Sequence, residues 1–167
     1  MQRPARLRHA NISSANATPR HPQHPIVTTD APLDTSFLQD ALDNVFAEWV
    51  RLLELRLISA KPGEVVLALP VTARHVHAGN VMCGQTLMAA ADTAMVLAVM
   101  SKLGTFRPMT TVQLQTTFLR PVAADAGEAR VTATVLRMGR TMAFGDIRIT
   151  TGADVLAAHA TTSYALL

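Results

Sequence analysis

The sequence contains one cysteine in 167 residues, few aromatic residues (4%) and few charged residues (16%). A single cysteine excludes an intramolecular disulfide framework and a cysteine-rich zinc site. The longest apolar stretch, residues 87–100, has 14 residues and includes Asp92, so we expect no membrane span. The first 30 residues lack the apolar segment of a secretory signal, and we expect a cytoplasmic protein. The hydrophobic content of 49% excludes a wholly disordered chain.

Acidic residues are nearly missing from the start of the chain. Residues 1–33 contain four arginines and one aspartate, whereas residues 34–167 contain 11 basic and 11 acidic residues. The first segment also holds five of the nine prolines and few large apolar residues. We therefore predict a disordered tail over residues 1–33 and one folded domain over residues 34–167. No aromatic residue accompanies the arginines of the tail, so the basic charge does not indicate nucleic-acid binding.

Beyond the tail, apolar residues recur with regular periods. Helical spacing predicts a short helix over residues 37–46 and a long helix over residues 84–101. Alternating apolar residues between Gly- and Pro-containing turns predict six strands. The first has apolar residues over 53–58 and is ended by Lys61-Pro62-Gly63, and the others lie over residues 65–69, 109–119, 128–138, 141–151 and 154–166. This order of elements indicates an α+β domain in which one antiparallel sheet packs on the central helix.

Asp92 is the single charged residue of the long predicted helix. Its neighbours at helical spacing cannot pair with a carboxylate: Met88, Ala89, Met95 and Val96. An unpaired buried carboxylate costs several kcal/mol, so Asp92 must find partners on another element or lie in a cleft. Such a carboxylate is either a general base or nucleophile, or an anchor for a neighbouring strand or subunit. The spacing alone leaves both interpretations open.

Gly84 lies at the predicted start of the same helix, directly after Cys83. Free backbone N–H groups and the positive end of the helix dipole favour an oxyanion there. The alternative is that Gly84 only turns the chain. Gly84 and Asp92 are eight residues apart, which is about 12 Å along a helix. One chain cannot bring both to one small reacting group, so a site that uses both requires a dimer.

The residues around this helix resemble a known family. The run from His75 to Leu87 (HVHAGNVMCGQTL), followed by Ala-Asp-Thr-Ala at residues 91–94, resembles the loop and central helix of hotdog-fold acyl-CoA thioesterases. The likeness is greatest to the phenylacetate-pathway (PaaI-like) group. Residues 111–121 and 139–144 resemble the strand and the turn that follow in that family. The resemblance implies the hotdog fold, an antiparallel sheet of about six strands wrapped around a long central helix.

The resemblance also implies roles for individual residues. Asp92 matches the catalytic carboxylate, and Gly84 matches the oxyanion donor that the partner subunit supplies. His77 takes the position of an amide that contacts the thioester or the attacking water, and it completes the predicted catalytic set. Cys83, Gln85 and Thr111 match substrate-binding positions, and Gln113, Arg137, Gly139, Arg140 and Thr141 match positions that contact coenzyme A. The resemblance implies no metal or redox cofactor, and coenzyme A enters as part of the substrate.

Three residues depart from the family pattern. His77 replaces an amide, Cys83 replaces a histidine, and Gln85 replaces the second residue of a Gly-Gly pair. We expect Gln85 to crowd the start of the helix and so to narrow the acyl pocket or displace the oxyanion hole, whereas His77 can still donate a hydrogen bond. Cys83, at a helix start, is a rival nucleophile. These departures leave the chemistry open.

The sequence thus predicts a thioesterase that hydrolyses a small or medium acyl-CoA, with aromatic acyl groups among the candidates. We expect a homodimer or a dimer of dimers, with no membrane or nucleic-acid partner. One alternative is a non-catalytic acyl-CoA-binding protein, in which the residues at positions 83 and 85 mark lost activity. Another is an enoyl-thioester hydratase or dehydratase that uses His77 and Asp92.

Overall fold

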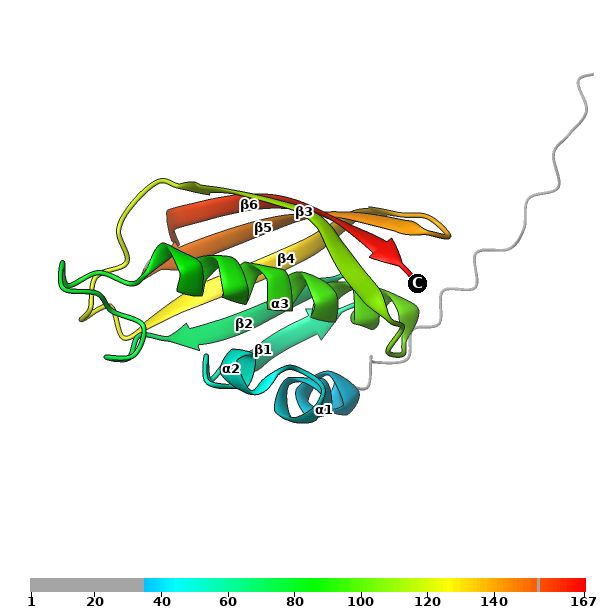
Figure 1. Ribbon diagram of the computed structural model, residues 1–167, viewed down its shortest axis with the longest axis horizontal. Coiled ribbons are helices and arrows are strands. Elements are labelled where there is room, and N and C mark those ends of the chain that lie inside the picture. Colours follow the sequence, from blue (N-terminus) through cyan, green and yellow to red (C-terminus); the bar gives the residue numbers. More distant parts are fainter. Residues whose placement is uncertain (1–34, 153) are drawn as a thin grey trace, which may run out of the picture. The chain divides into compact units, whose positions relative to one another are not determined.

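A computed structural model describes residues 35–152 and 154–167, and the predicted tail over residues 1–33 lies outside these described residues. The elements in chain order are α1 (Ser36–Asn44), α2 (Glu48–Arg51), β1 (Arg56–Lys61), β2 (Glu64–Pro70), α3 (Gly84–Leu103), β3 (Met109–Phe118), β4 (Glu128–Met138), β5 (Met142–Thr151) and β6 (Val155–Leu166). The six strands form one antiparallel sheet in the order β1-β2-β4-β5-β6-β3. The sheet curves around α3 (Figure 1), which is the predicted hotdog fold.

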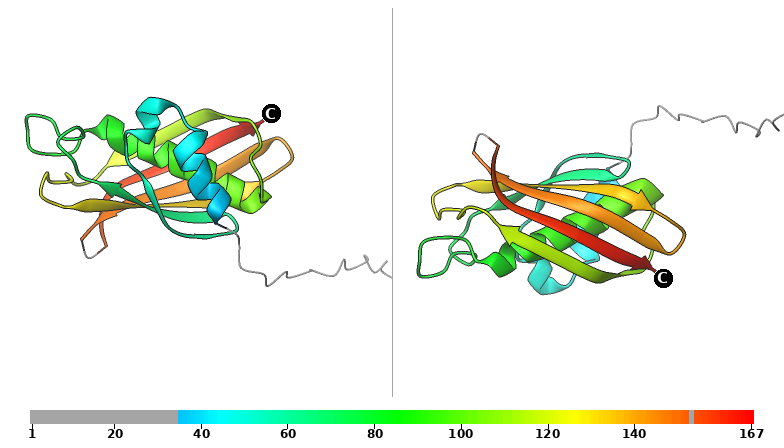
Figure 2. Two further views of the ribbon diagram at one scale, coloured as in Figure 1. Left: turned by 90° about the horizontal axis from the view of Figure 1, so that it is seen from below. Right: turned by 90° about the horizontal axis from the view of Figure 1, so that it is seen from above.

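The central helix α3 is apolar on nearly every face, so it is stable only where other elements cover it. The sheet covers one side, and α1 and α2 cross the other side (Figure 2). By length and composition alone this 20-residue helix could cross a membrane, so the expectation of no membrane span does not follow from the sequence pattern. In this structure most of the helix is buried inside the domain, as in the core helix of a globular fold.

The sheet approaches α3 closely at Gly145 of β5. A Cβ atom at Gly145 would lie 2.2 Å from Met95 Sδ and 3.1 Å from the carbonyl oxygen of Thr134. Met95 is fully buried, so any side chain at position 145 would force it out of its place in the core. The helix and the sheet therefore pack tightly because this strand position has no side chain.

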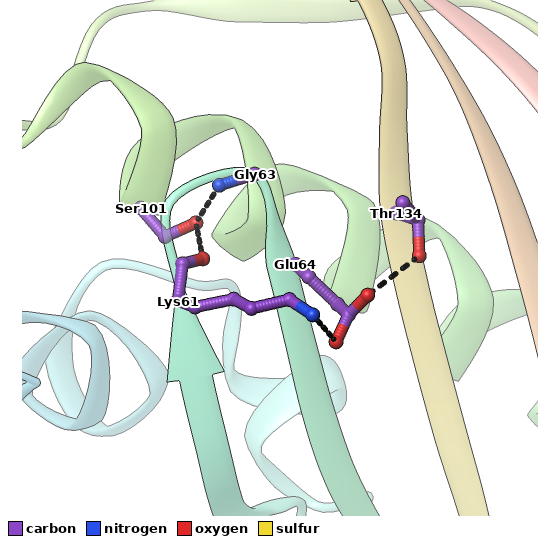
Figure 3. Close-up of polar contacts among 5 residues, drawn as sticks. All are labelled: Lys61, Gly63, Glu64, Ser101 and Thr134. Atoms are coloured by element: carbon purple, nitrogen blue, oxygen red, sulfur yellow. Dashed lines mark hydrogen bonds and ion pairs between the residues drawn. The ribbon is translucent and has the colours of Figure 1, made fainter.

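Ser101, near the end of α3, ties the helix to the turn between β1 and β2 (Figure 3). Its Oγ accepts a hydrogen bond from the Gly63 N–H (2.9 Å) and lies 3.0 Å and 2.8 Å from the carbonyl oxygens of Lys61 and Ala98. The single hydroxyl proton is shared between these two carbonyls. The neighbouring Lys61–Glu64 ion pair is partly exposed and contributes little to stability.

Replacing Ser101 with alanine should lower the free energy of unfolding by about 2 kcal/mol, because the buried Gly63 N–H loses its acceptor. Urea unfolding followed by circular dichroism measures the change. Ser59→Ala is the matched control, since Ser59 is exposed on β1 and surface substitutions usually change stability by less than about 0.5 kcal/mol. If the two variants are equally stable, Ser101 does not hold the turn.

The described elements match the sequence prediction closely, with two exceptions. The start of the first predicted strand was wrong, because its apolar residues begin at Leu53 whereas β1 begins at Arg56. Its predicted end at Lys61-Pro62-Gly63 is confirmed. Leu53 and Leu55 are buried in the connection between α2 and β1 rather than in a strand. The alternation of apolar residues therefore begins before the strand does. The four-residue helix α2 was not predicted, and it contains the only tryptophan of the chain, Trp49.

Candidate active site

The carboxylate of Asp92 finds its partners on the sheet. Asp92 lies half-buried in the first half of α3. Thr111 Oγ1, on β3, donates a hydrogen bond to Asp92 Oδ1 (2.9 Å), and the Tyr164 hydroxyl, on β6, donates to the same oxygen. Thr111 and Tyr164 are paired residues of adjacent strands, so both hydroxyl groups reach the helix at one level. The predicted need for partners on another element is thereby confirmed.

Tyr164 was not predicted from the sequence, although it is the only tyrosine of the chain. Its side chain is 1% exposed, and its hydroxyl also lies 3.0 Å from the backbone carbonyl oxygen of Asp92. The pKa of Tyr164 is raised far above its usual value, mainly by burial and secondly by the negative charge of Asp92. This shift favours the protonated form, in which the hydroxyl group can donate to Asp92.

Asp92 opens onto an apolar hollow of about 360 Å³. The other side chains that line it come from α2, α3 and β3: Trp49, Gln85, Met88, Ala89, Thr111 and Leu114. Trp49 is 62% exposed and Met88 is 37% exposed. An apolar hollow with few polar groups is typical of a small-molecule site. The structure thus brings two predicted substrate-binding residues, Gln85 and Thr111, together with Asp92.

A second hollow, of about 330 Å³, lies at the start of α3 and is lined by Gly84 and by residues 118–122. Cys83 is the N-cap residue, and its side chain makes no capping hydrogen bond. Within the described ranges, the backbone N–H groups of Gly84 and Gln85 also have no acceptor. A Cβ atom at Gly84 would lie 3.0 Å from Cζ of Phe118. The Gly84 amide is therefore an available donor, and its role as the oxyanion donor stays a prediction.

The three predicted catalytic residues do not converge within one chain. Gly84 and Asp92 line different hollows. His77 is exposed in the loop before α3, where its Nδ1 accepts a hydrogen bond from the Gly79 N–H (3.0 Å). No hydrogen bond joins His77 to Asp92 in the described part of the chain. A site that uses all three residues needs more than one copy of the chain.

Gln113, the first of the predicted coenzyme A contacts, lies on the other face of the sheet from Asp92. The register of β3 shifts between Thr111, which pairs with Tyr164, and Gln113, which pairs with Ser163. Ser163 and Tyr164 are successive residues of β6, so their side chains, and those of their partners on β3, point to opposite faces of the sheet. Together with Leu136 and Phe144, Gln113 lines a hollow of about 220 Å³. The side chains of Leu136 and Phe144 are 66% and 44% exposed. The structure therefore places Gln113 away from Asp92 of its own chain.

The other predicted coenzyme A contacts lie in or beside the turn between β4 and β5: Arg137, Gly139, Arg140 and Thr141. Arg107 holds this turn against the end of the chain, since its guanidinium donates to the carbonyl oxygens of Arg140 (3.2 Å) and Leu167 (3.0 Å). Arg137 and Arg140 are exposed, and no ion pair is found for either within residues 35–152 and 154–167. Both are open to an anionic partner.

Among residues 35–152 and 154–167, the remaining side chains form no metal site and no activated thiol. Across the described residues, no group of three His, Cys, Asp or Glu side chains is placed to hold a metal ion. Cys83 is a half-buried free cysteine, and in the same residues its thiol has no hydrogen-bonded histidine or carboxylate that would act as a base. Asp92 is therefore a better candidate for a reacting group than Cys83.

Comparison with known proteins points to one family. Residues 73–158 match the thioesterase superfamily. A curated relative, “Putative esterase TV1331” of Thermoplasma volcanium, is 28% identical over 106 residues, which cover 64% of this chain and 77% of that protein. The conserved protein PA5202 of Pseudomonas aeruginosa is 30% identical with a TM-score of 0.68, covering 73% of this chain and 95% of that structure. Zebrafish thioesterase superfamily member 2 is 26% identical with a TM-score of 0.70, covering 82% and 99%.

Solved structures at lower identity share the fold. The Escherichia coli PaaI protein, from the phenylacetic acid degradation operon, is 24% identical with a TM-score of 0.63, covering 77% of this chain and 90% of that structure. A Streptococcus pneumoniae hypothetical thioesterase, solved with coenzyme A, is 19% identical with a TM-score of 0.63, covering 68% and 85%. The resemblance seen in residues 75–94 is thereby confirmed at the level of the family and its fold.

Proposed function

Since this chain belongs to the thioesterase superfamily, we propose that it hydrolyses the thioester bond of a small or medium acyl-CoA to a free acid and coenzyme A. The observation that carries the proposal is Asp92, a carboxylate held by two hydroxyl groups beside an apolar hollow. Such a carboxylate can activate water or attack a carbonyl carbon. The match to the family supports the reaction class, and the hollow supports an apolar acyl group.

In the proposed reaction Asp92 takes a proton from water while the water oxygen attacks the thioester carbonyl carbon. The carbonyl oxygen becomes an oxyanion, which the Gly84 amide of the partner subunit stabilises. The C–S bond then breaks, and the departing sulfur takes the proton back from Asp92. If Asp92 instead attacks the carbonyl, the C–S bond breaks to leave a mixed anhydride, which water hydrolyses in a second step.

A homodimer supplies the missing half of this site. The Gly84 amide is free and lies in a hollow that does not include Asp92. In an isologous dimer, each chain would lend Gly84 to the Asp92 of the other, giving two equal sites. The strand β3 lies at one edge of the sheet, so the backbone groups on its outer side are available for such pairing. A dimer of dimers would repeat the same arrangement.

The acyl group would enter the hollow beside Asp92. Trp49, Met88 and Leu114 give it apolar walls, and the indole of Trp49 can stack against an aromatic acyl group. The nucleotide part of coenzyme A would reach exposed cations, for which Arg137 and Arg140 are the candidates because arginine binds phosphate through two N–H groups. The coenzyme A complex of the Streptococcus pneumoniae protein supports this choice of ligand.

Thiol release from a panel of short, medium, long and aromatic acyl-CoAs tests the proposal, and we expect turnover of at least one small, medium or aromatic ester. Because Trp49 is the only tryptophan and lines the hollow, its fluorescence reports binding independently of turnover. A fluorescence change without thiol release from any ester would contradict hydrolysis and favour the acyl-CoA-binding alternative. Loss of enoyl-CoA absorbance without thiol release would favour the hydratase alternative.

A further inference from the structure

Both hydroxyl groups that contact the Asp92 carboxylate do so at the same oxygen. Thr111 Oγ1 donates to Oδ1 (2.9 Å), and so does the Tyr164 hydroxyl. Within the described residues, Oδ2 of Asp92 has no hydrogen-bond partner. Asp92 is also part of the wall of the apolar hollow. The two carboxylate oxygens therefore have different surroundings, and only one is committed to the protein.

We propose that Tyr164 is a positioning residue, which together with Thr111 occupies Oδ1 and leaves Oδ2 as the oxygen that reacts with water or with the thioester. This inference rests on the proposed function of Asp92. Tyr164 is 1% exposed, so it acts on the substrate only through the carboxylate. The hydroxyl groups prevent rotation of the side chain, and the pre-set geometry lowers the entropy cost of reaching the transition state.

The Tyr164 hydroxyl lies close to both the backbone and the side chain of Asp92. It lies 3.0 Å from the Asp92 carbonyl oxygen and within hydrogen-bond reach of the Asp92 side chain. It has one proton to donate, and an ionised carboxylate is the stronger acceptor. Burial and the charge of Asp92 raise the pKa of Tyr164, so the donor is not lost by ionisation. The hydroxyl group of Tyr164 therefore donates to the carboxylate from a fixed position on β6.

The Tyr164→Phe variant tests the proposal because it keeps the ring in the core and removes only the hydroxyl group. We expect kcat to fall about 10- to 100-fold with KM changed less than about twofold, as a lost hydrogen bond to a charged group predicts. The matched control is Ser101→Ala, which removes a buried hydroxyl group from the other end of α3. It should lose stability and keep kcat. If Tyr164→Phe also keeps kcat, the hydroxyl group is only a structural anchor.

A double variant shows whether Tyr164 acts through Asp92. In the Asp92→Asn background, adding Tyr164→Phe should lower the residual single-turnover rate by less than about twofold, since residues that act as one unit are not additive. A full further loss of the single-variant size would show an effect that does not pass through the carboxylate. That result would overturn the proposal.

A titration tests the contact without any turnover. Tyr164 is the only tyrosine, so phenolate absorbance near 295 nm reports on it alone. In the wild type the phenolate should form only when the chain unfolds. In folded Asp92→Asn it should form at lower pH, because the negative charge that contributes to raising the pKa of Tyr164 is removed. Identical titrations, with folding checked by circular dichroism, would overturn the proposed contact.

The two assays separate this inference from the function on which it rests. If no acyl-CoA is hydrolysed while the titrations differ, the proposed function fails, and the positioning role fails with it although the contact exists. If esters are hydrolysed and Tyr164→Phe is fully active, the function stands and the positioning role alone is overturned.

Discussion

Replacing Asp92 with asparagine is expected to lower kcat for thiol release by two orders of magnitude or more. An amide cannot take a proton from water and cannot attack a carbonyl carbon, so both versions of the proposed mechanism lose their reacting group. Asparagine has nearly the same shape, and its carbonyl oxygen can still accept hydrogen bonds from Thr111 and Tyr164. The fold should therefore persist, and binding of the acyl-CoA should still change the fluorescence of Trp49.

Steady-state kinetics on the best ester of the panel, run beside Asp125→Asn, provide the measurement. Asp125 is exposed in the connection between β3 and β4, so its amide variant makes the same chemical change away from the candidate site. It should keep wild-type kcat. If Asp92→Asn retains more than about a tenth of wild-type kcat, Asp92 is the anchor that the sequence pattern equally allowed, and the thioester is hydrolysed by another group.

Much of the fold could be predicted because its signals are local. The apolar run of α3 with a single carboxylate, and the Gly and Pro residues that separate β3, β4 and β5, depend only on neighbouring positions. The start of β1 could not be placed, because Leu53 and Leu55 are apolar for burial in a loop rather than in a strand. Burial and strand pairing produce the same alternation over so few residues.

The candidate site was predictable only in part, for a related reason. Asp92 was identifiable because a lone charge in an apolar helix requires an explanation. Tyr164 follows it by 72 positions and meets it only because β6 packs against α3. Trp49 lies on α2, a helix of four residues that shows no sequence period. The packing of β6 against α3 and the path of one short helix, both set by tertiary structure, decide these contacts.

The second large effect is expected from Gly84→Pro, which should lower kcat about 100- to 1,000-fold by removing one oxyanion donor. Proline lacks the N–H group, yet it is well tolerated at the first position of a helix, which Gly84 occupies in α3. The preceding residue, Cys83, has φ −62° and ψ 136°, a conformation that favours a following proline. The helix should therefore form normally, as circular dichroism would show.

Gly84→Ala is the matched control for the loss of the amide proton. Alanine adds the same Cβ atom, 3.0 Å from the ring of Phe118, and keeps the N–H group. It should retain kcat within about threefold if only the donor matters. Equal losses in the alanine and proline variants would mean that crowding against Phe118 is responsible, and the Gly84 amide would then not be the oxyanion donor.

The same proline variant decides whether two chains build one site. In a random 1:1 mixture of Asp92→Asn and Gly84→Pro subunits, half of the dimers are mixed, and each mixed dimer has one site with an intact Asp92 and an intact Gly84. Two inactive proteins should therefore regain about a quarter of wild-type activity after subunit exchange. If each chain instead built its own site, every site in the mixture would be defective and no activity would return. Because Asp92 and Gly84 lie about 12 Å apart along one helix, we expect recovery.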